Sequence, residues 1–143
     1  MSADAHAGPQ LSEDAVLDGF LKECMNMIKR RLWSKRECSA FKEPVDPIKL
    51  NIPDYHTYIK HPMDVGTVKK KLDSGMYKSP LEVRDDVRLV WRNCAAYNPP
   101  GHPMRNMGDI LAAAWEATWK DSNIEERWFQ HLQQQDLQAS SHA

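Results

Sequence analysis

Apolar residues recur at helical spacing along most of the chain, and almost no segment alternates as a half-buried strand would. The first apolar stripe follows Ser12, which suits an N-cap, and runs for about six turns to Leu32. A second, shorter stripe follows Asp64 as N-cap and stops at Gly75, which suits a left-handed C-terminal cap. The pattern therefore predicts a helix over each of these segments.

The third helix has the clearest start signal in the sequence. Ser79 takes the N-cap position, Pro80 the first helical position and Glu82 the capping-box position. This helix must end before the two prolines at 99 and 100, because proline cannot continue a helix. A fourth helix is expected to begin near Pro103. Four amphipathic helices predict an all-α fold built as a four-helix bundle.

The two ends of the chain lie outside this bundle, to which we assign residues 11–120. After Lys120, a second Ser-x-x-Glu pattern that starts at Ser122 indicates either a kink or a short extra helix, and the sequence does not decide between them. We assign residues 121–135 to a C-terminal helical extension. Residues 1–10 and 136–143 are small, polar and aperiodic, so disordered ends are expected there.

A long connection separates the first and second helices, from Ser34 to Met63. Helix connections in bundles usually take about 2 to 8 residues, so one this long is either functional or disordered. Its prolines exclude a long helix, but it is more apolar than a solvated linker. We expect it to fold back on one end of the bundle, with a helical turn that begins at Asp54, and to line a cavity together with the 97–104 loop.

Such a cavity would have aliphatic and aromatic walls and few polar groups, notably Tyr55, Tyr97 and Asn98. Walls of this kind suit a neutral ligand with an apolar stem and one hydrogen-bonding head. A phosphate or a free ammonium is disfavoured, because burying an unpaired charge costs several kcal/mol.

Composition and charge narrow the functional classes further. The chain has 143 residues, 41% of them hydrophobic, and a net charge of −1, which fits one globular domain and disfavours a protein that coats nucleic acid. Three cysteines without close pairing favour a reduced, intracellular setting. No apolar run approaches the roughly 18 residues of a membrane span, and the first residues resemble neither a secretory signal nor a transit peptide.

Several short motifs follow one another in the loop regions. They are Phe41-x-x-Pro44-Val45-Asp46, Pro53-Asp54-Tyr55, Ile59-Lys60-His61-Pro62-Met63-Asp64 and Asn93-Cys94-x-x-Tyr97-Asn98-x-Pro100-Gly101. In this order and spacing they resemble the bromodomain family, and within it most closely the BET-type domains. The resemblance extends from about Leu17 to Trp119, which is most of the chain.

The resemblance implies a left-handed four-helix bundle, with two loops at one end that bind acetylated lysine, usually in histone tails in the nucleus. By the same resemblance, Asn98 donates its side-chain amide to the acetyl carbonyl, and Tyr55 holds a water that bridges to the same oxygen. The other implied site residues line the channel (Val45, Leu50, Ile52 and Tyr97), touch the acetyl methyl group (Phe41) or stand at the gatekeeper position beside the entrance (Met104).

The sequence departs from the family at Ser39-Ala40-Phe41, where Trp-Pro-Phe is common. The aromatic shelf, which is the surface against which peptide residues pack in the family, is therefore missing. A bromodomain-like scaffold that has lost acetyl-lysine binding and docks other proteins is therefore the alternative. We expect a monomeric module without a cofactor. We expect no enzymatic activity, because no base accompanies Cys94, and no metal, because no Cys or His pair has zinc spacing. Its expected partner is an acetylated histone tail or another acetylated protein, with neither a membrane nor direct nucleic-acid contact.

Overall fold

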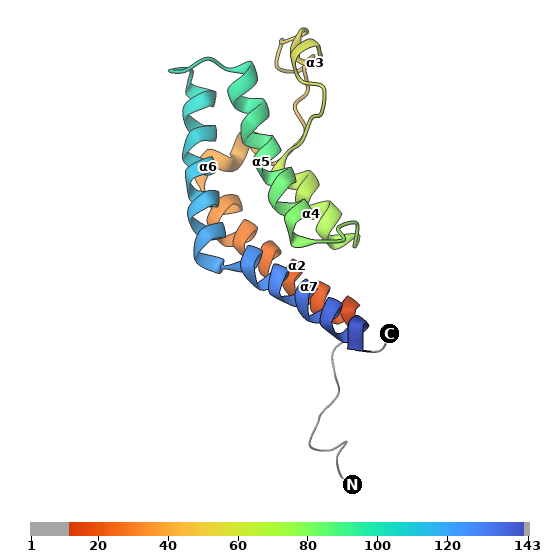
Figure 1. The fold of residues 1–143 in the computed structure, drawn as a ribbon. Helices are drawn as coiled ribbons and strands as arrows, with labels where there is room; N and C mark the ends of the chain where they lie inside the picture. The colour runs from red at the N-terminus through yellow and green to blue at the C-terminus, as the bar shows by residue number, and fades with distance from the viewer. Residues whose placement is uncertain (1–11, 142–143) are drawn as a thin grey trace.

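The computed structural model describes residues 12–141, which form helices and connecting loops without a β-strand (Figure 1). Four helices build the bundle: α2 (Glu13–Ile28), α4 (Val65–Asp73), α5 (Pro80–Tyr97) and α6 (Pro103–Ser122). These are the four helices that the hydrophobic pattern predicts, so the all-α four-helix bundle is confirmed. The predicted disorder of residues 1–10 concerns a segment outside the described residues.

The predicted N-caps form hydrogen bonds to the backbone at each helix start. Their side-chain oxygens accept from the N–H of Ala15 at 3.1 Å (Ser12), of Thr67 at 2.8 Å (Asp64) and of Leu81 at 2.9 Å (Ser79). Each bond satisfies one of the N–H groups that a helix start leaves without an intrahelical partner. The Ser79 capping box is incomplete, because Glu82 accepts from the N–H of Lys78 and not from that of Ser79.

Large apolar side chains from α2, α5 and α6 fill the core between the helices. The fully buried residues include Ile28, Val83, Val87, Leu111 and Trp115. Burying one such aliphatic side chain contributes about 1.5 to 3 kcal/mol, so this layer supplies most of the driving force for folding. Within the described residues, no helix has both the length and the apolar character that a membrane crossing requires.

Two buried glycines allow elements to approach more closely than a side chain would permit. A Cβ on Gly66, in α4, would lie 2.0 Å from the backbone carbonyl oxygen of Lys42. A Cβ on Gly108, in α6, would lie 2.6 Å from Sγ of Cys94 in α5. The first contact anchors the long loop to α4, and the second sets the spacing between α5 and α6.

The structure corrects the first helix and its connection. The regular α-helix ends at Ile28, and the expected last turn is instead a π-helix, η1 (Lys29–Trp33). The connection then forms a 3₁₀ helix, η2 (Arg36–Phe41), which the sequence analysis did not anticipate. The expected helical turn after Asp54 is present as α3 (Tyr55–Tyr58), although the Asp54 side chain does not cap it.

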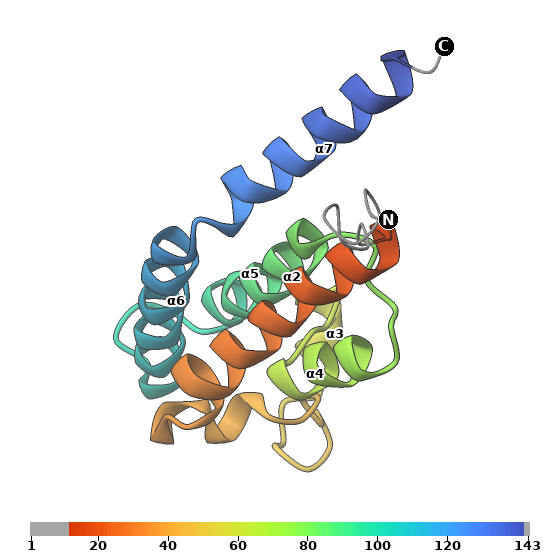
Figure 2. The same ribbon diagram turned by 90° about the horizontal axis from the view of Figure 1, so that it is seen from below.

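The C-terminal region is a separate helix, α7 (Ile124–Ser141), that projects away from the bundle in Figure 2. Asn123 takes a left-handed conformation with φ 57° and divides α7 from α6, which decides for an extra helix rather than a kink. The expectation that residues 136–143 are disordered is wrong for residues 136–141, which continue α7. The helical extension is therefore longer than the predicted 121–135.

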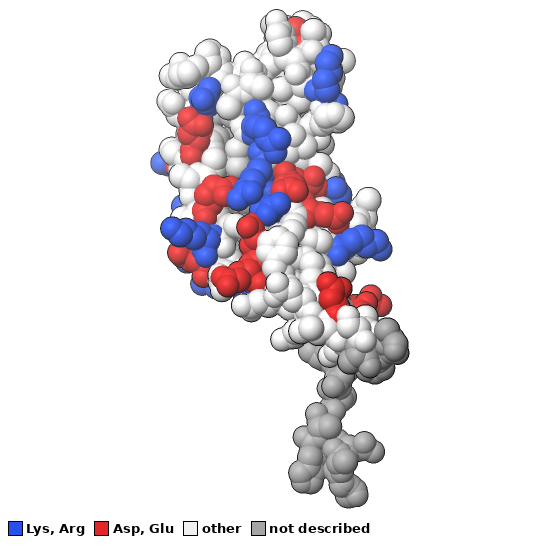
Figure 3. Space-filling view, viewed as in Figure 1, with Lys and Arg blue, Asp and Glu red and all other residues white. Residues whose placement is uncertain are grey.

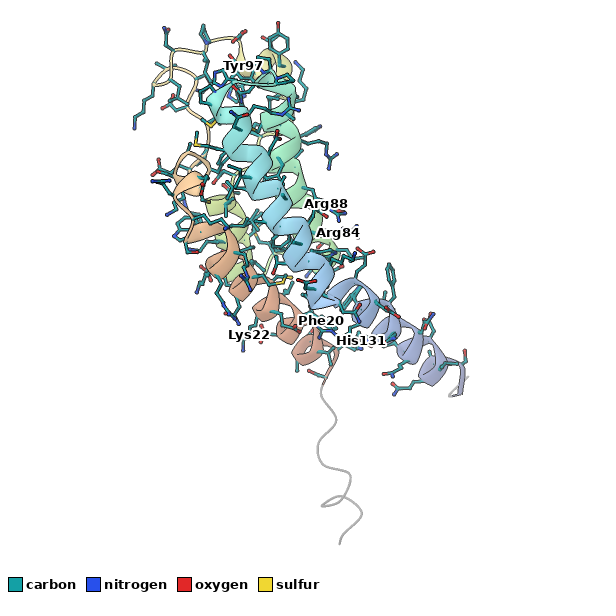
Figure 4. All side chains as sticks on the ribbon, turned by 90° about the vertical axis from the view of Figure 1, so that its left-hand side faces the viewer. Phe20, Lys22, Arg84, Arg88, Tyr97 and His131 are labelled. Carbon is teal, nitrogen blue, oxygen red and sulfur yellow. The ribbon has the colours of Figure 1, made fainter. Side chains whose placement is uncertain are left out.

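Contacts at its first turns hold α7 on the bundle. Arg84 of α5 pairs with Glu125 at 2.6 Å, and Arg127 pairs with Glu23 of α2 at 2.6 Å. Nearby, the rings of Phe20 and Trp128 meet edge to face, 5.4 Å apart. Figure 4 shows Tyr97 at the loop end, Arg84 near the middle of the molecule, and Phe20 farther from the loop end, where α7 begins.

Candidate functional site

A cavity of about 300 Å³ opens at the loop end, between the long connection and the facing ends of α5 and α6. Its lining includes all eight residues that the sequence analysis selects: Phe41, Val45, Leu50, Ile52, Tyr55, Tyr97, Asn98 and Met104. They come from positions up to 63 residues apart, Phe41 to Met104, and the fold brings every one of them to the same cavity.

Aromatic and aliphatic side chains form most of the cavity wall. Phe41 is buried and packs edge to face on Trp91, with ring centroids 5.5 Å apart. Leu50 lines the same cavity but is 53% exposed, which places it at the mouth. The interior is therefore apolar, while the rim is open to solvent.

Asn98 is the C-cap residue of α5, in an extended conformation with φ −106° and ψ 125°. Its side-chain nitrogen donates to the carbonyl oxygen of Cys94 at 3.1 Å, which fixes the carboxamide beside the cavity. A carboxamide nitrogen carries two hydrogens, and this bond uses one of them; the nitrogen also lies 3.7 Å from Sγ of Cys94, which is a weak acceptor. A ligand oxygen in the cavity would be a stronger acceptor for the second hydrogen than this sulfur.

Tyr55 and Tyr97 form adjoining parts of the wall, with ring centroids 5.0 Å apart. Tyr55 is only 6% exposed, and its burial raises the pKa of the hydroxyl, so this group stays a neutral donor. The Tyr97 hydroxyl instead donates to Asp54 at 2.6 Å, and this hydrogen bond raises its pKa to about 12. Tyr97 thus contributes its ring to the cavity, while its hydroxyl is bound to the long loop.

The hydroxyl of Tyr55 makes no hydrogen bond to any other group in the part of the chain that the structure describes. Within an otherwise apolar cavity it can therefore hold a water or a ligand oxygen. Together with the second amide hydrogen of Asn98, whose protein acceptor is the weak sulfur of Cys94, it gives the cavity two donors for a ligand.

The sequence analysis missed several residues of the lining, namely Ala40, Glu43, Met63, Asp64, Val90, Cys94 and His102. Three of these, Met63, Asp64 and Cys94, lie inside the family motifs, so their positions were a usable signal. Glu43 is an unspecified position of the first motif and His102 lies in the 97–104 loop, so only the fold reveals that their side chains reach the cavity.

Two of these missed residues are chemically restrained. The Asp64 carboxylate accepts from the backbone N–H and the hydroxyl of Thr67, at 2.8 and 2.6 Å, so it serves as the cap of α4. The Cys94 thiol donates to the carbonyl oxygen of Met104 at 3.4 Å, and burial raises its pKa. Cys94 is therefore a protonated wall residue, because the nucleophile of cysteine chemistry is the thiolate.

The charge at the site suits a neutral ligand. None of the residues that line this cavity is Lys or Arg, so no cation is present to bind a phosphate or a carboxylate. Among the described residues, no group of three or more Cys, His, Asp or Glu side chains is placed to hold a metal ion. The arrangement can enclose an apolar stem and donate hydrogen bonds to one polar head.

Comparisons with known proteins agree with this geometry. Residues 22–110 match the family model described as Bromodomain. The chain is 51% identical over 100 residues to transcription factor GTE11 of Arabidopsis thaliana, an alignment that covers 70% of this chain and 16% of that protein. It is 44% identical over 99 residues to the SWR1 complex bromodomain subunit bdf1 of Schizosaccharomyces pombe, covering 69% of this chain and 17% of that protein.

A solved structure gives the same result for the fold. The second bromodomain of Candida albicans Bdf1, bound to an imidazopyridine, is similar with a TM-score of 0.66 and 35% identity, and the match covers 71% of this chain and 97% of that one. That bromodomain is a left-handed four-helix bundle, which agrees with the predicted architecture. The chain spans only about a sixth of the length of the two curated relatives named above: the alignments cover 16% of GTE11 and 17% of bdf1.

Proposed function

The chain belongs to the bromodomain family of acetyl-lysine readers, and from this premise we propose that its cavity binds acetylated lysine in histone tails. The observation that carries the proposal is the presence, in one apolar cavity, of a fixed carboxamide whose second hydrogen has only a weak sulfur acceptor and of a buried neutral phenol. The proposed module is not an enzyme and acts in the nucleus, in the way its transcription-factor and chromatin relatives suggest.

Acetylation changes the charge of the lysine head group, which is the property to which an apolar cavity is most sensitive. It converts a strongly hydrated ammonium into a neutral amide, while the apolar stem is kept. An unmodified lysine would have to leave its charge unpaired among apolar walls, at a cost of several kcal/mol. Discrimination therefore comes mainly from desolvation, and the polar groups of the site add orientation.

Each polar group then has a defined role in the proposed complex. Asn98 donates its second amide hydrogen to the acetyl carbonyl, and Tyr55 holds a water that bridges to the same oxygen. Phe41, Val45, Ile52 and Tyr97 enclose the stem and the methyl group, and Leu50 and Met104 stand at the entrance.

The missing aromatic shelf favours one alternative, a scaffold that no longer reads acetyl-lysine and instead docks proteins through its helices. Ser39 and Ala40 are exposed and small at the positions where the shelf would stand. The open apolar cavity and the two donors beside it favour the reader, because a scaffold that docks through its helices would not need either feature.

Calorimetric titration tests the proposal with pairs of histone-tail peptides that differ only in acetylation of one lysine. We expect the acetylated peptide of at least one pair to bind and its unmodified partner to bind far more weakly. Equal affinity for both members of every pair, or no binding by any acetylated peptide, would show that the cavity does not read this modification. A stable protein partner found in the second case would favour the scaffold.

A further inference from the structure

A second depression adjoins the cavity on the other side of Asn98. It is lined by Asp54, Tyr58, Ala96, Tyr97, Asn98, Pro99 and His102, and its volume is about 340 Å³. Tyr97, Asn98 and His102 line both spaces, so these three residues form a shared boundary between them. A peptide whose acetyl-lysine enters the cavity can therefore place a neighbouring side chain in this second depression.

The walls of the second depression combine aromatic faces with a carboxylate. The rings of Tyr58 and Tyr97 lie 6.1 Å apart at an angle of 68°, which makes a corner with two aromatic walls. Tyr58 is 64% exposed, an unusual position for a large aromatic side chain without a ligand. Asp54 accepts the Tyr97 hydroxyl through one oxygen, so its second oxygen remains free to accept from a ligand.

No cation of the protein occupies this corner. Within residues 12–141, the basic side chains that lie over aromatic rings are on other rings: Lys42 and Lys69 on Trp33, Lys71 on Tyr77 and Arg127 on Phe20. The nearby Arg105 is paired with Asp109 and donates to the carbonyl oxygens of Ala95 and Asn98. It does not line the depression.

We propose that the Asp54–Tyr58–Tyr97 corner is a subsite for an unmodified lysine or arginine that flanks the acetyl-lysine in the same peptide. The cation would lie against the two aromatic rings and donate to the free oxygen of Asp54. This inference rests on the proposed function, since the acetyl-lysine in the main cavity brings the cation to the corner.

The two adjoining spaces then select opposite states of basic residues. The cavity has no carboxylate free to pair with a buried ammonium, because Asp64 is bound to Thr67 and Glu43 lies exposed at the rim. The corner is open to solvent, so a cation can bind there without losing all of its water. The protein would thus select peptides in which one lysine is neutral because it is acetylated and a flanking lysine or arginine keeps its positive charge.

The test uses acetyl-lysine peptides with neutral flanks, compared by calorimetry with peptides that carry a single arginine at each flanking position in turn. We expect one position to tighten binding by about 3- to 20-fold, the sum of an exposed cation–π contact and an exposed ion pair. The gain should shrink as salt rises, because the ion pair is screened. No gain at any flanking position would overturn the inference.

Two variants and a control assign the gain to the corner. Asp54→Asn removes the charge but keeps a side-chain oxygen that can accept from the Tyr97 hydroxyl, and Tyr58→Leu removes one aromatic wall. Neither residue lines the main cavity. Each should abolish most of the arginine gain and leave the affinity for the neutral-flank peptide nearly unchanged. Asp73→Asn, an exposed carboxylate at the end of α4, is the matched control and should keep the full gain.

The failure of this inference is distinct from the failure of the proposed function. An arginine gain that persists in both Asp54→Asn and Tyr58→Leu would place the cation elsewhere and overturn the subsite, while acetyl-lysine reading would stand. Absence of binding by every acetylated peptide would overturn the proposed function and the subsite with it.

Discussion

The polar side chains at the two ends of the bundle differ in how fully the protein itself satisfies their hydrogen bonds. At the α7 end, Glu125 accepts from both Arg84 and the indole N–H of Trp119, and Arg127 forms two hydrogen bonds to Glu23. At the loop end, the hydroxyl of Tyr55 has no acceptor among the described residues, and the second carboxamide hydrogen of Asn98 meets only the weak sulfur acceptor of Cys94. On the face shown in Figure 3, charged residues likewise gather over the middle of the molecule and are fewer at the loop end.

The difference separates polar groups that hold the fold together from polar groups that are placed to bind a ligand in the proposed function. The α7 end contributes to stability, because its donors and acceptors satisfy one another. At the loop end, donors without a strong protein acceptor lie in an apolar setting, where a hydrogen bond to a ligand oxygen is stronger than in water. Substitutions at the α7 end should therefore change the free energy of unfolding, and substitutions at the loop end should change the affinity for the peptide.

The largest effect is expected where the long loop is anchored to the bundle. Gly66→Ala would place its Cβ 2.0 Å from the carbonyl oxygen of Lys42, and backbone cannot move aside as a side chain can. We expect the free energy of unfolding to fall by about 3 kcal/mol, measured by denaturant titration. Gly19→Ala is the control: its Cβ meets nothing within 4 Å, and it should stabilise α2 by up to about 1 kcal/mol. Equal stability of the two variants would refute the close approach.

The next effect concerns the carboxamide at the loop end. Asn98→Ala removes the ligand donor, and we expect acetyl-lysine binding to weaken by about 10- to 100-fold in calorimetry, the cost of a buried carbonyl left unpaired. The thermal unfolding midpoint should change little, because the side chain makes only one bond to the protein backbone. Unchanged affinity would remove Asn98 from the mechanism.

A smaller binding effect is expected from Tyr55→Phe. The variant keeps the ring that packs on Tyr97 but loses the hydroxyl that would hold the bridging water. We expect about a 3- to 10-fold loss of affinity with little change in stability. Tyr77→Phe is a contrasting variant, because the Tyr77 hydroxyl donates to Asp86 at 2.6 Å, far from the cavity. It should alter stability and leave peptide affinity unchanged; the reverse pattern would contradict the division between the two ends.

The smallest effect is expected at the α7 end. The hydrogen bond from Arg84 lowers the pKa of Glu125 below its ordinary value of 4.5, so the ionised form is favoured in the folded state. The stabilisation is present above the unfolded pKa and is lost as the pH falls through the lower, folded pKa. Glu125→Gln should therefore cost about 0.5 kcal/mol near pH 7, because the pair is partly exposed, and should flatten the loss of stability in acid. Identical pH profiles for the two proteins would show that the pair is not coupled to folding.

Local chemistry allowed much of the fold to be predicted from the sequence. Ser12, Asp64 and Ser79 cap their helices because a short side-chain oxygen can reach a backbone N–H in the next turn, a contact that depends only on neighbouring residues. Gly75 takes φ 66° after α4, as expected of a left-handed cap. The motifs also select eight residues that the fold collects around one cavity, although their roles in binding remain predictions.

The features that escaped prediction depend on distant contacts. The π-helical turn at Lys29–Trp33 lies where α2 meets η2 and α6, and nothing in its own five residues signals a change of helical period. Residues 136–141 lack an apolar stripe, so the sequence gives no sign that α7 continues through them. The pairing of Tyr97 with Asp54 joins residues 43 positions apart, which no local pattern can reveal.

The close approach at Gly108 has a consequence for the wall of the cavity. A Cβ there would lie 2.6 Å from Sγ of Cys94 and 3.6 Å from Cζ of Phe41, and both of these residues line the cavity. A residue with a side chain at position 108 would therefore have to displace Cys94 or move α6 away from α5. The packing of these two helices thus bears directly on the shape of the cavity, although residue 108 itself does not line it.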